Sequence, residues 1–188
     1  MDSTCDIAKL IHNGGVFYDV EGKTPSEIYA KVSKMIDLPD GITSEMVYNA
    51  LCAREDVLST AVGNGIALPH ARTPIMKDDN SQKICVVYLK ESIDMKAPDE
   101  RSVFVMFVLL TANSQFHLKV LSSLAGLFRD VKFRKALENH ADFLPQSVEV
   151  DVKVHQILPV KPDAAGVGLL QEVDTPQQGG LAGAGGSD

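Results

Sequence analysis

One segment of the sequence, GNGIALPHAR at residues 63–72, places His70 directly after a proline and shortly after two glycines. The two glycines and the asparagine between them tolerate positive φ, so the backbone can turn tightly and expose N–H groups that suit an anion. Pro69 fixes its own φ and favours an extended Leu68, which holds the following histidine on a stiff stretch of chain. A nucleophilic imidazole needs such a fixed orientation. The segment therefore makes His70 a candidate nucleophile, although a histidine beside a glycine turn can also be purely structural.

A second histidine, His117, lies in the first turn of a helix that we expect Ser114 to cap. A helix N-terminus favours anions and disfavours a protonated imidazole. A neutral His117 could therefore hydrogen-bond a phosphoryl oxygen or another ring. The alternative is a histidine that only fills the core. His12, His140 and His155 sit in polar or terminal contexts, and we assign them no role.

Two arginines are candidates for binding phosphate. Arg54 ends a predicted helix, where it could clamp phosphate oxygens in a bidentate fork. A cation at a helix C-terminus is also electrostatically favourable without any function. Arg72 is a second candidate, because it lies two residues after His70 and so on the same side of an extended chain.

Predicted helices alternate with apolar runs that are typical of buried strands. Capping residues and apolar spacing predict five helices: one over 5–12, and one after each of the caps Thr24, Thr43 or Ser44, Ser114 and Asp130. In the helix after Thr43 or Ser44, the residues expected to be buried are Met46, Val47, Ala50 and Leu51. In the helix capped by Ser114, one face is expected to hold Leu118, Leu121, Leu124, Ala125 and Phe128. Strands are predicted over Val16–Val20, Ile84–Leu89 and Val103–Leu110. This alternation predicts an α/β (α+β sandwich) fold, with a small mixed sheet of four or five strands covered by helices on both faces.

The C-terminal part of the chain differs in composition from the rest. Residues 161–188 hold seven of the fourteen glycines and no aromatic residue, so we expect a disordered tail there. Residues 1–160 are expected to form the folded domain. Within it, residues 141–160 are ambiguous, because valines at 148, 150, 152 and 154 alternate with other residues as in a strand.

Composition excludes several classes of partner. The formal net charge of −7 and the lack of a clustered basic face argue against nucleic acid. The longest apolar run, 103–110, is too short to cross a bilayer, and the acidic N-terminus lacks the features of a secretory signal. Three cysteines without motif spacing fit small core residues in a reducing compartment. We therefore expect a cytoplasmic protein without membrane insertion.

Three blocks of sequence carry a resemblance to a known family. The first is REDVLSTAV running into GNGIALPHAR at 54–72. The second is Ile93-Asp94 together with Ala97-Pro98-Asp99. The third is FVLL at 107–110, followed by HLKVL at 117–121, LFRD at 127–130 and Phe133-Arg134. In this order and spacing, the chain resembles the enzyme IIA component of the bacterial phosphoenolpyruvate:sugar phosphotransferase system. The branch is the fructose/mannitol type, which includes nitrogen-related regulatory IIA proteins. The resemblance covers residues 5–145, and Ala61 stands where the family commonly has glycine.

The resemblance implies a role for each candidate. His70 would accept a phosphoryl group from a histidine phosphocarrier protein (HPr-like), Arg54 would offset the charge of its oxygens, and His117 would donate one hydrogen bond. The other ring nitrogen of His70 would bond a backbone carbonyl or a carboxylate, which would fix the tautomer. No cofactor and no metal are implied. An apolar ring around His70 would serve two partners in turn.

The destination of the phosphoryl group is open at this level. It would pass to a IIB component for sugar uptake, or serve as a regulatory signal toward a target protein. The alternative is a purely regulatory binding module, switched by phosphorylation of His70 and without a role in transport. A metal hydrolase using His70 and His117 is a weaker hypothesis, because no third ligand stands at a recognisable spacing.

Overall fold

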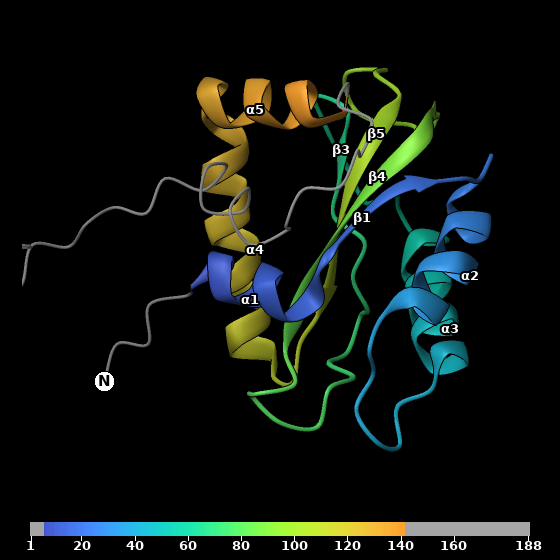
Figure 1. Ribbon diagram of the computed structural model, residues 1–188, viewed down its shortest axis with the longest axis vertical. Coiled ribbons are helices and arrows are strands. Elements are labelled where there is room, and N and C mark those ends of the chain that lie inside the picture. The colour runs from blue at the N-terminus through green and yellow to red at the C-terminus, as the bar shows by residue number, and fades with distance from the viewer. Residues whose placement is uncertain (1–5, 142–188) are drawn as a thin grey trace, which may run out of the picture.

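A five-stranded mixed sheet forms the middle layer of the protein (Figure 1). The computed structural model describes residues 6–141. The strands are β1 (Val16–Val20), β2 (Ala61–Gly63), β3 (Ile66–Ala67), β4 (Lys83–Ile93) and β5 (Val103–Leu110), arranged in the order β1-β4-β5-β3-β2. β4 and β5 pair antiparallel in the centre, while β1 runs parallel to β4 and β3 runs parallel to β5. The two central strands are the two long apolar runs of the sequence, as predicted.

Helices cover both faces of this sheet. They are α1 (Ile7–Gly14), α2 (Pro25–Met35), α3 (Ser44–Glu55), α4 (Ser114–Arg129) and α5 (Val131–Ala141). Figure 1 shows α1, α4 and α5 on one side of the sheet and α2 and α3 on the other. Each side has its own cluster of buried apolar side chains, and β4 and β5 contribute alternate residues to the two clusters. The predicted α/β sandwich with a small mixed sheet is confirmed.

Polar caps begin the helices close to the predicted residues. The side chains of Thr24 and Thr43 accept hydrogen bonds from the first turns of α2 and α3. The prediction for α4 is wrong by one residue, because Asn113 rather than Ser114 is the N-cap. Asn113 has an extended backbone, and its side-chain oxygen accepts the N–H of Phe116 at 2.8 Å. The first helix begins at Ile7, after the N-cap Asp6.

The predicted core faces of two helices are partly wrong. Leu118 and Ala125 are exposed, because the buried line of α4 is displaced around the helix and consists of Val120, Leu124 and Phe128. In α3, Met46 is exposed and Ala50 is only half-buried, while the buried residues are Val47 and Leu51. Each of these helices packs on the sheet through one stripe of residues, so a side chain 100° or more around the helix from that stripe can face solvent.

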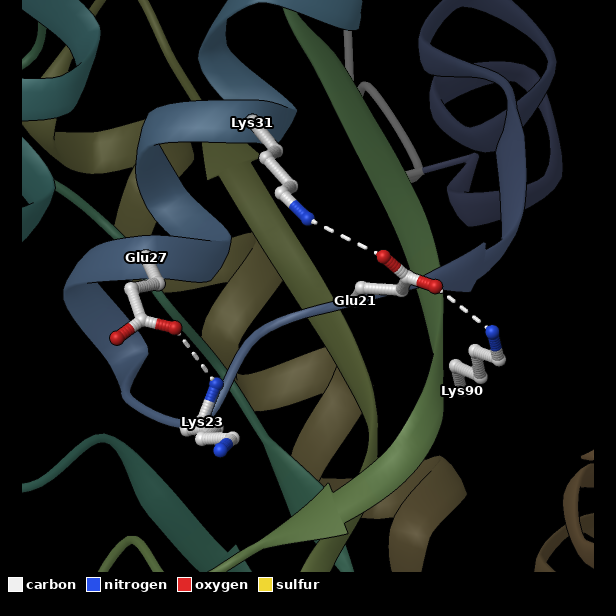
Figure 2. Close-up of polar contacts among 5 residues, drawn as sticks. All are labelled: Glu21, Lys23, Glu27, Lys31 and Lys90. Atoms are coloured by element: carbon white, nitrogen blue, oxygen red, sulfur yellow. Dashed lines mark hydrogen bonds and ion pairs between the residues drawn. The ribbon is translucent and has the colours of Figure 1, made fainter.

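Charged side chains form ion pairs and a hydrogen bond around the start of α2 (Figure 2). The Glu21 carboxylate lies 2.7 Å from the ammonium of Lys90 on β4 and 3.8 Å from that of Lys31 on α2. The Glu27 carboxylate accepts the backbone N–H of Lys23 at 2.9 Å, just before the N-cap. These contacts are exposed, so they contribute little to the stability of the fold.

The glycine turn joins β2 to β3 with three consecutive residues at positive φ: +91° at Gly63, +54° at Asn64 and +73° at Gly65. The backbone conformation predicted from sequence is thus confirmed. The anion bound there is a side chain of the same protein, since the Asn64 N–H donates to the Asp99 carboxylate at 2.6 Å. A Cβ on Gly65 would lie 2.5 Å from the ring of Phe104. Both the positive φ and the lack of space therefore favour glycine at this position.

The predictions for the strand-like residues 142–160 and for the glycine-rich tail 161–188 lie outside the described residues.

Two glycine-to-alanine substitutions should change stability in opposite directions. Gly65→Ala imposes a left-handed backbone on a Cβ-bearing residue and a contact with Phe104, so it should destabilise the protein by about 1–3 kcal/mol. Gly126→Ala lies within α4, where a Cβ meets nothing within 4 Å, so it should stabilise by about 0.5–1 kcal/mol. Urea unfolding of both variants measures the difference. A neutral Gly65→Ala would contradict the constraint described for this turn.

Candidate functional site

His70 lies on an extended stretch beside the C-terminal end of the central strand β5. It forms a parallel β-bridge with Leu109, and the carbonyl of Pro69 accepts the Leu109 N–H at 2.8 Å. Proline has no N–H to donate, so this stretch pairs through its carbonyl and continues β3 past its last residue. The backbone that carries His70 is therefore held by the core of the sheet, as the stiffness of the segment predicted.

Two hydrogen bonds of opposite sense define the tautomer of His70. Its Nδ1 lies 2.7 Å from the carbonyl oxygen of Leu68, and its Nε2 lies 3.2 Å from Nε of Arg54. A carbonyl can only accept and a guanidinium can only donate. Nδ1 therefore carries the hydrogen and Nε2 keeps its lone pair. The resemblance left two partners open for this nitrogen, a backbone carbonyl or a carboxylate. In the structure the partner is the Leu68 carbonyl.

Arg54 reaches His70 from the last turn of α3. Its Nη1 donates to the carbonyl of Leu58 at 2.6 Å, so the guanidinium bridges the His70 ring and the turn that follows the helix. The other arginine singled out from the sequence, Arg72, is exposed, and no hydrogen bond joins it to His70 within the part of the chain that the structure describes.

His117 stands across from His70 in the first turn of α4. The two ring centroids are 5.2 Å apart, with the planes tilted by 51°. Nδ1 of His117 lies 3.1 Å from the hydroxyl of buried Thr111, which fixes the ring and leaves its Nε2 for a ligand. The structure thus brings together His70, Arg54 and His117, which come from three separate parts of the sequence.

Burial and charge keep both histidines neutral. Partial burial lowers the pKa of His70, and the Arg54 cation lowers it further, while the Leu68 carbonyl and the Glu55 carboxylate act in the opposite direction. Burial also lowers the pKa of His117, with a smaller contribution from His70. A neutral imidazole with a free lone pair at Nε2 is the form that can attack an electrophile.

Sequence reasoning missed the residues that support this centre. The Glu55 carboxylate accepts hydrogen bonds from the hydroxyl of Tyr29 and from both the N–H and the hydroxyl of Thr60. Glu55 and Thr60 lie inside the first block of the resemblance, but nothing in that block reveals a contact with α2. Thr111, which holds His117, gave no signal because it simply follows an apolar strand.

Exposed apolar side chains border the site. Val57 and Leu58 lie on the turn that Arg54 holds, and Leu118 follows His117 on α4; their side chains are 62%, 68% and 66% exposed. Exposed aliphatic groups are typical of a docking surface where they form one contiguous patch.

Two other kinds of feature are absent from the described residues. Between residues 6 and 141, no group of three or more His, Cys, Asp or Glu side chains is placed to hold a metal ion. Over the same residues, none of the helices combines the length and apolar character needed to cross a membrane.

Comparison with known proteins places these features in context. The model of the family described as phosphoenolpyruvate-dependent sugar phosphotransferase system, EIIA 2, matches residues 9–144. The chain is 29% identical over 153 residues to the nitrogen regulatory protein of Pseudomonas aeruginosa, which covers 78% of this chain and 96% of that protein.

Two solved structures have a similar fold. The nitrogen regulatory protein IIA-Ntr from Neisseria meningitidis aligns with a TM-score of 0.59 and 25% identity, over 76% of this chain and 91% of that one. The complex of enzyme IIAMTL and phosphorylated enzyme IIBMTL from Escherichia coli aligns with a TM-score of 0.52 and 18% identity, over 76% and 92%. At that identity, the second likeness concerns the fold alone.

The neutral state of His70 should be measurable. Titration followed by proton–nitrogen NMR of the rings should give His70 a midpoint below the ordinary pKa of 6.5, because burial disfavours the imidazolium. Arg54→Met keeps most of the covering side chain but removes the cation, so it should move the midpoint upward. A wild-type midpoint at or above 6.5 would show that the site favours the charged ring.

Proposed function

Because this chain belongs to the EIIA 2 family of the phosphoenolpyruvate-dependent sugar phosphotransferase system, we propose that it carries a phosphoryl group on Nε2 of His70. The protein is a phosphoryl-transfer component of that system. The donor would be a histidine phosphocarrier protein (HPr-like). The acceptor would be a IIB component or a regulatory target, and the site of action would be the cytoplasm.

The polarity of the His70 ring supports this proposal most directly. Its Nδ1 is occupied by the Leu68 carbonyl, so Nε2 is the nitrogen with an available lone pair. Nε2 also faces the guanidinium of Arg54, and the ring of His117 lies beside the His70 ring. A cation and a hydrogen-bond donor beside a nucleophilic nitrogen stabilise the charge of a transferred phosphoryl group.

The transfer balances in atoms and charge. As Nε2 attacks, its bond to phosphorus forms and the phosphorus–nitrogen bond of the donor phosphohistidine breaks in line. The donor ring is protonated at its other nitrogen, so it leaves neutral. His70 keeps its hydrogen on Nδ1 and becomes positively charged, and the Leu68 carbonyl stabilises that charge. Arg54 would release Nε2 and turn its N–H groups toward the phosphoryl oxygens.

Two observations bear on the next acceptor. The Pseudomonas aeruginosa relative, matched over nearly its whole length, is named as a nitrogen regulatory protein, which favours a regulatory signal. The matching family is described as part of a sugar phosphotransferase system, which favours passage to a IIB component for sugar uptake. A purely regulatory module, switched by phosphorylation of His70 and without transport, is the second candidate function.

A phosphorylation assay tests the acceptor. With enzyme I, the phosphocarrier and labelled phosphoenolpyruvate, the wild-type protein should take up acid-labile, base-stable label, and His70→Ala should take up none. His12→Ala, on the exposed side of α1, is the matched control and should label normally. Acid-labile label on His70→Ala would rule out this assignment. Adding candidate IIB proteins afterwards distinguishes passage to IIB from retention as a signal.

Arg54→Ala should slow phosphoryl uptake about 100-fold, because one preorganised cationic donor is lost from the transition state. The helix ends at the next residue, so the fold should stay intact by circular dichroism. Arg54→Lys should recover only part of the rate, since an ammonium cannot reproduce the two directed N–H bonds. Uptake by Arg54→Ala at the wild-type rate would remove this arginine from the proposed site.

A further inference from the structure

The Glu55 carboxylate lies behind the proposed phosphorylation site and bonds three donors. Tyr29, a fully buried residue of α2, donates its hydroxyl at 2.9 Å. Thr60 donates its backbone N–H at 3.1 Å and its hydroxyl at 2.5 Å. Both polar hydrogens of Thr60 are therefore directed at one side chain, so the position of Thr60 is set by Glu55.

Thr60 is in turn bonded to Leu68, the residue that orients His70. The Thr60 carbonyl accepts the N–H of Leu68 at 2.9 Å, and the Leu68 carbonyl accepts Nδ1–H of His70 at 2.7 Å. Thr60 and Leu68 are both buried, so water does not compete for these bonds. A continuous series of hydrogen bonds thus runs from Glu55 to His70.

From these contacts we infer that Glu55 is a positioning residue for phosphoryl transfer to His70. It holds Thr60, and through Thr60 and Leu68 it fixes the tautomer and the direction of the imidazole. The inference rests on the proposed function of His70, but its structural part can be measured without any transfer.

The chemistry of the site requires a carboxylate at position 55. An ionised carboxylate only accepts hydrogen bonds, and here it accepts from a hydroxyl on Tyr29 and from two groups of Thr60. A glutamine would keep one acceptor oxygen and place an NH₂ group against one of these donors. The negative charge also raises the pKa of His70, in the direction that supports the positively charged phosphorylated ring.

A positioning role differs measurably from a merely structural one. A structural contact would lower the stability of every part of the protein and leave the ring of His70 in one tautomer. A positioning contact would lower kcat for phosphoryl uptake while KM for the donor stays the same, because Glu55 contacts Tyr29 and Thr60 rather than the apolar surface formed by Val57, Leu58 and Leu118.

The test compares Glu55→Gln with Glu91→Gln, which removes the same charge from an exposed position at the end of β4. For Glu55→Gln we expect kcat about tenfold lower with an unchanged KM, since small errors of alignment are costly in transfer reactions. Ring nitrogen shifts should show one Nδ1–H tautomer of His70 in the wild type and in Glu91→Gln. Glu55→Gln should show a mixture of tautomers.

Wild-type kcat together with a single His70 tautomer in Glu55→Gln would overturn the inference. If that variant does not fold, Thr60→Val replaces it, because valine keeps the volume and the backbone N–H but removes the hydroxyl. It should give the same mixed tautomer and a smaller fall in kcat, and an unchanged ring would again contradict the inference. Failure of the proposed function gives a different result: the wild type itself takes no label on His70, while the tautomer comparison remains valid.

Discussion

The imidazole of His70 is held between an acceptor and a donor, and the rest of the site depends on that polarity. The Leu68 carbonyl takes the hydrogen of Nδ1, and the Arg54 guanidinium faces the lone pair of Nε2. If both neighbours were acceptors or both were donors, the tautomer would be undetermined or the ring would have to be charged. Burial then lowers the pKa of the ring, so that the nucleophilic form prevails near neutral pH.

Other parts of the fold maintain these two neighbours. The glycine turn before His70 is held by the Asp99 carboxylate, and the turn after α3 is held by the bond from the Ser59 hydroxyl to the Met95 carbonyl, at 2.5 Å. Both partners come from the loop between β4 and β5. This explains why the second block of the resemblance, which contains no candidate for chemistry, accompanies the block that carries His70. The loop that contains this block holds the backbone on both sides of β2, through Met95 before the strand and Asp99 after it.

Much of the architecture could be predicted from local patterns. The strands Val16–Val20 and Val103–Leu110 were predicted with their observed bounds, since continuous or alternating apolar runs between turn residues have few other interpretations. The cap of α4 was misplaced because Asn113 and Ser114 are both good N-caps, and only the backbone conformation distinguishes them. The order of the strands in the sheet could not be predicted from the sequence, because it depends on pairing between distant segments.

The residues of the candidate site were also only partly predictable from the sequence. His70, Arg54 and His117 could be named as candidates from their placement at the ends of elements, and the family resemblance assigned them their roles. Glu55 and Thr111 could not be predicted from the sequence, because their roles depend on contacts in the folded structure. Glu55 bonds Thr60, and Thr111 bonds His117. A carboxylate in a helix and a threonine after a strand are too common in sequences to be singled out.

The two apolar cores have a consequence for folding. Arg54 ends a helix that packs on one core, whereas His117 begins a helix that packs on the other, and His70 is attached to the sheet between them. A chain that has formed only one core therefore lacks one of the two groups beside His70. Partly folded molecules, including those with one layer transiently detached, cannot assemble the centre. Competence for the proposed chemistry is thus a property of the complete three-layer structure and reports its integrity.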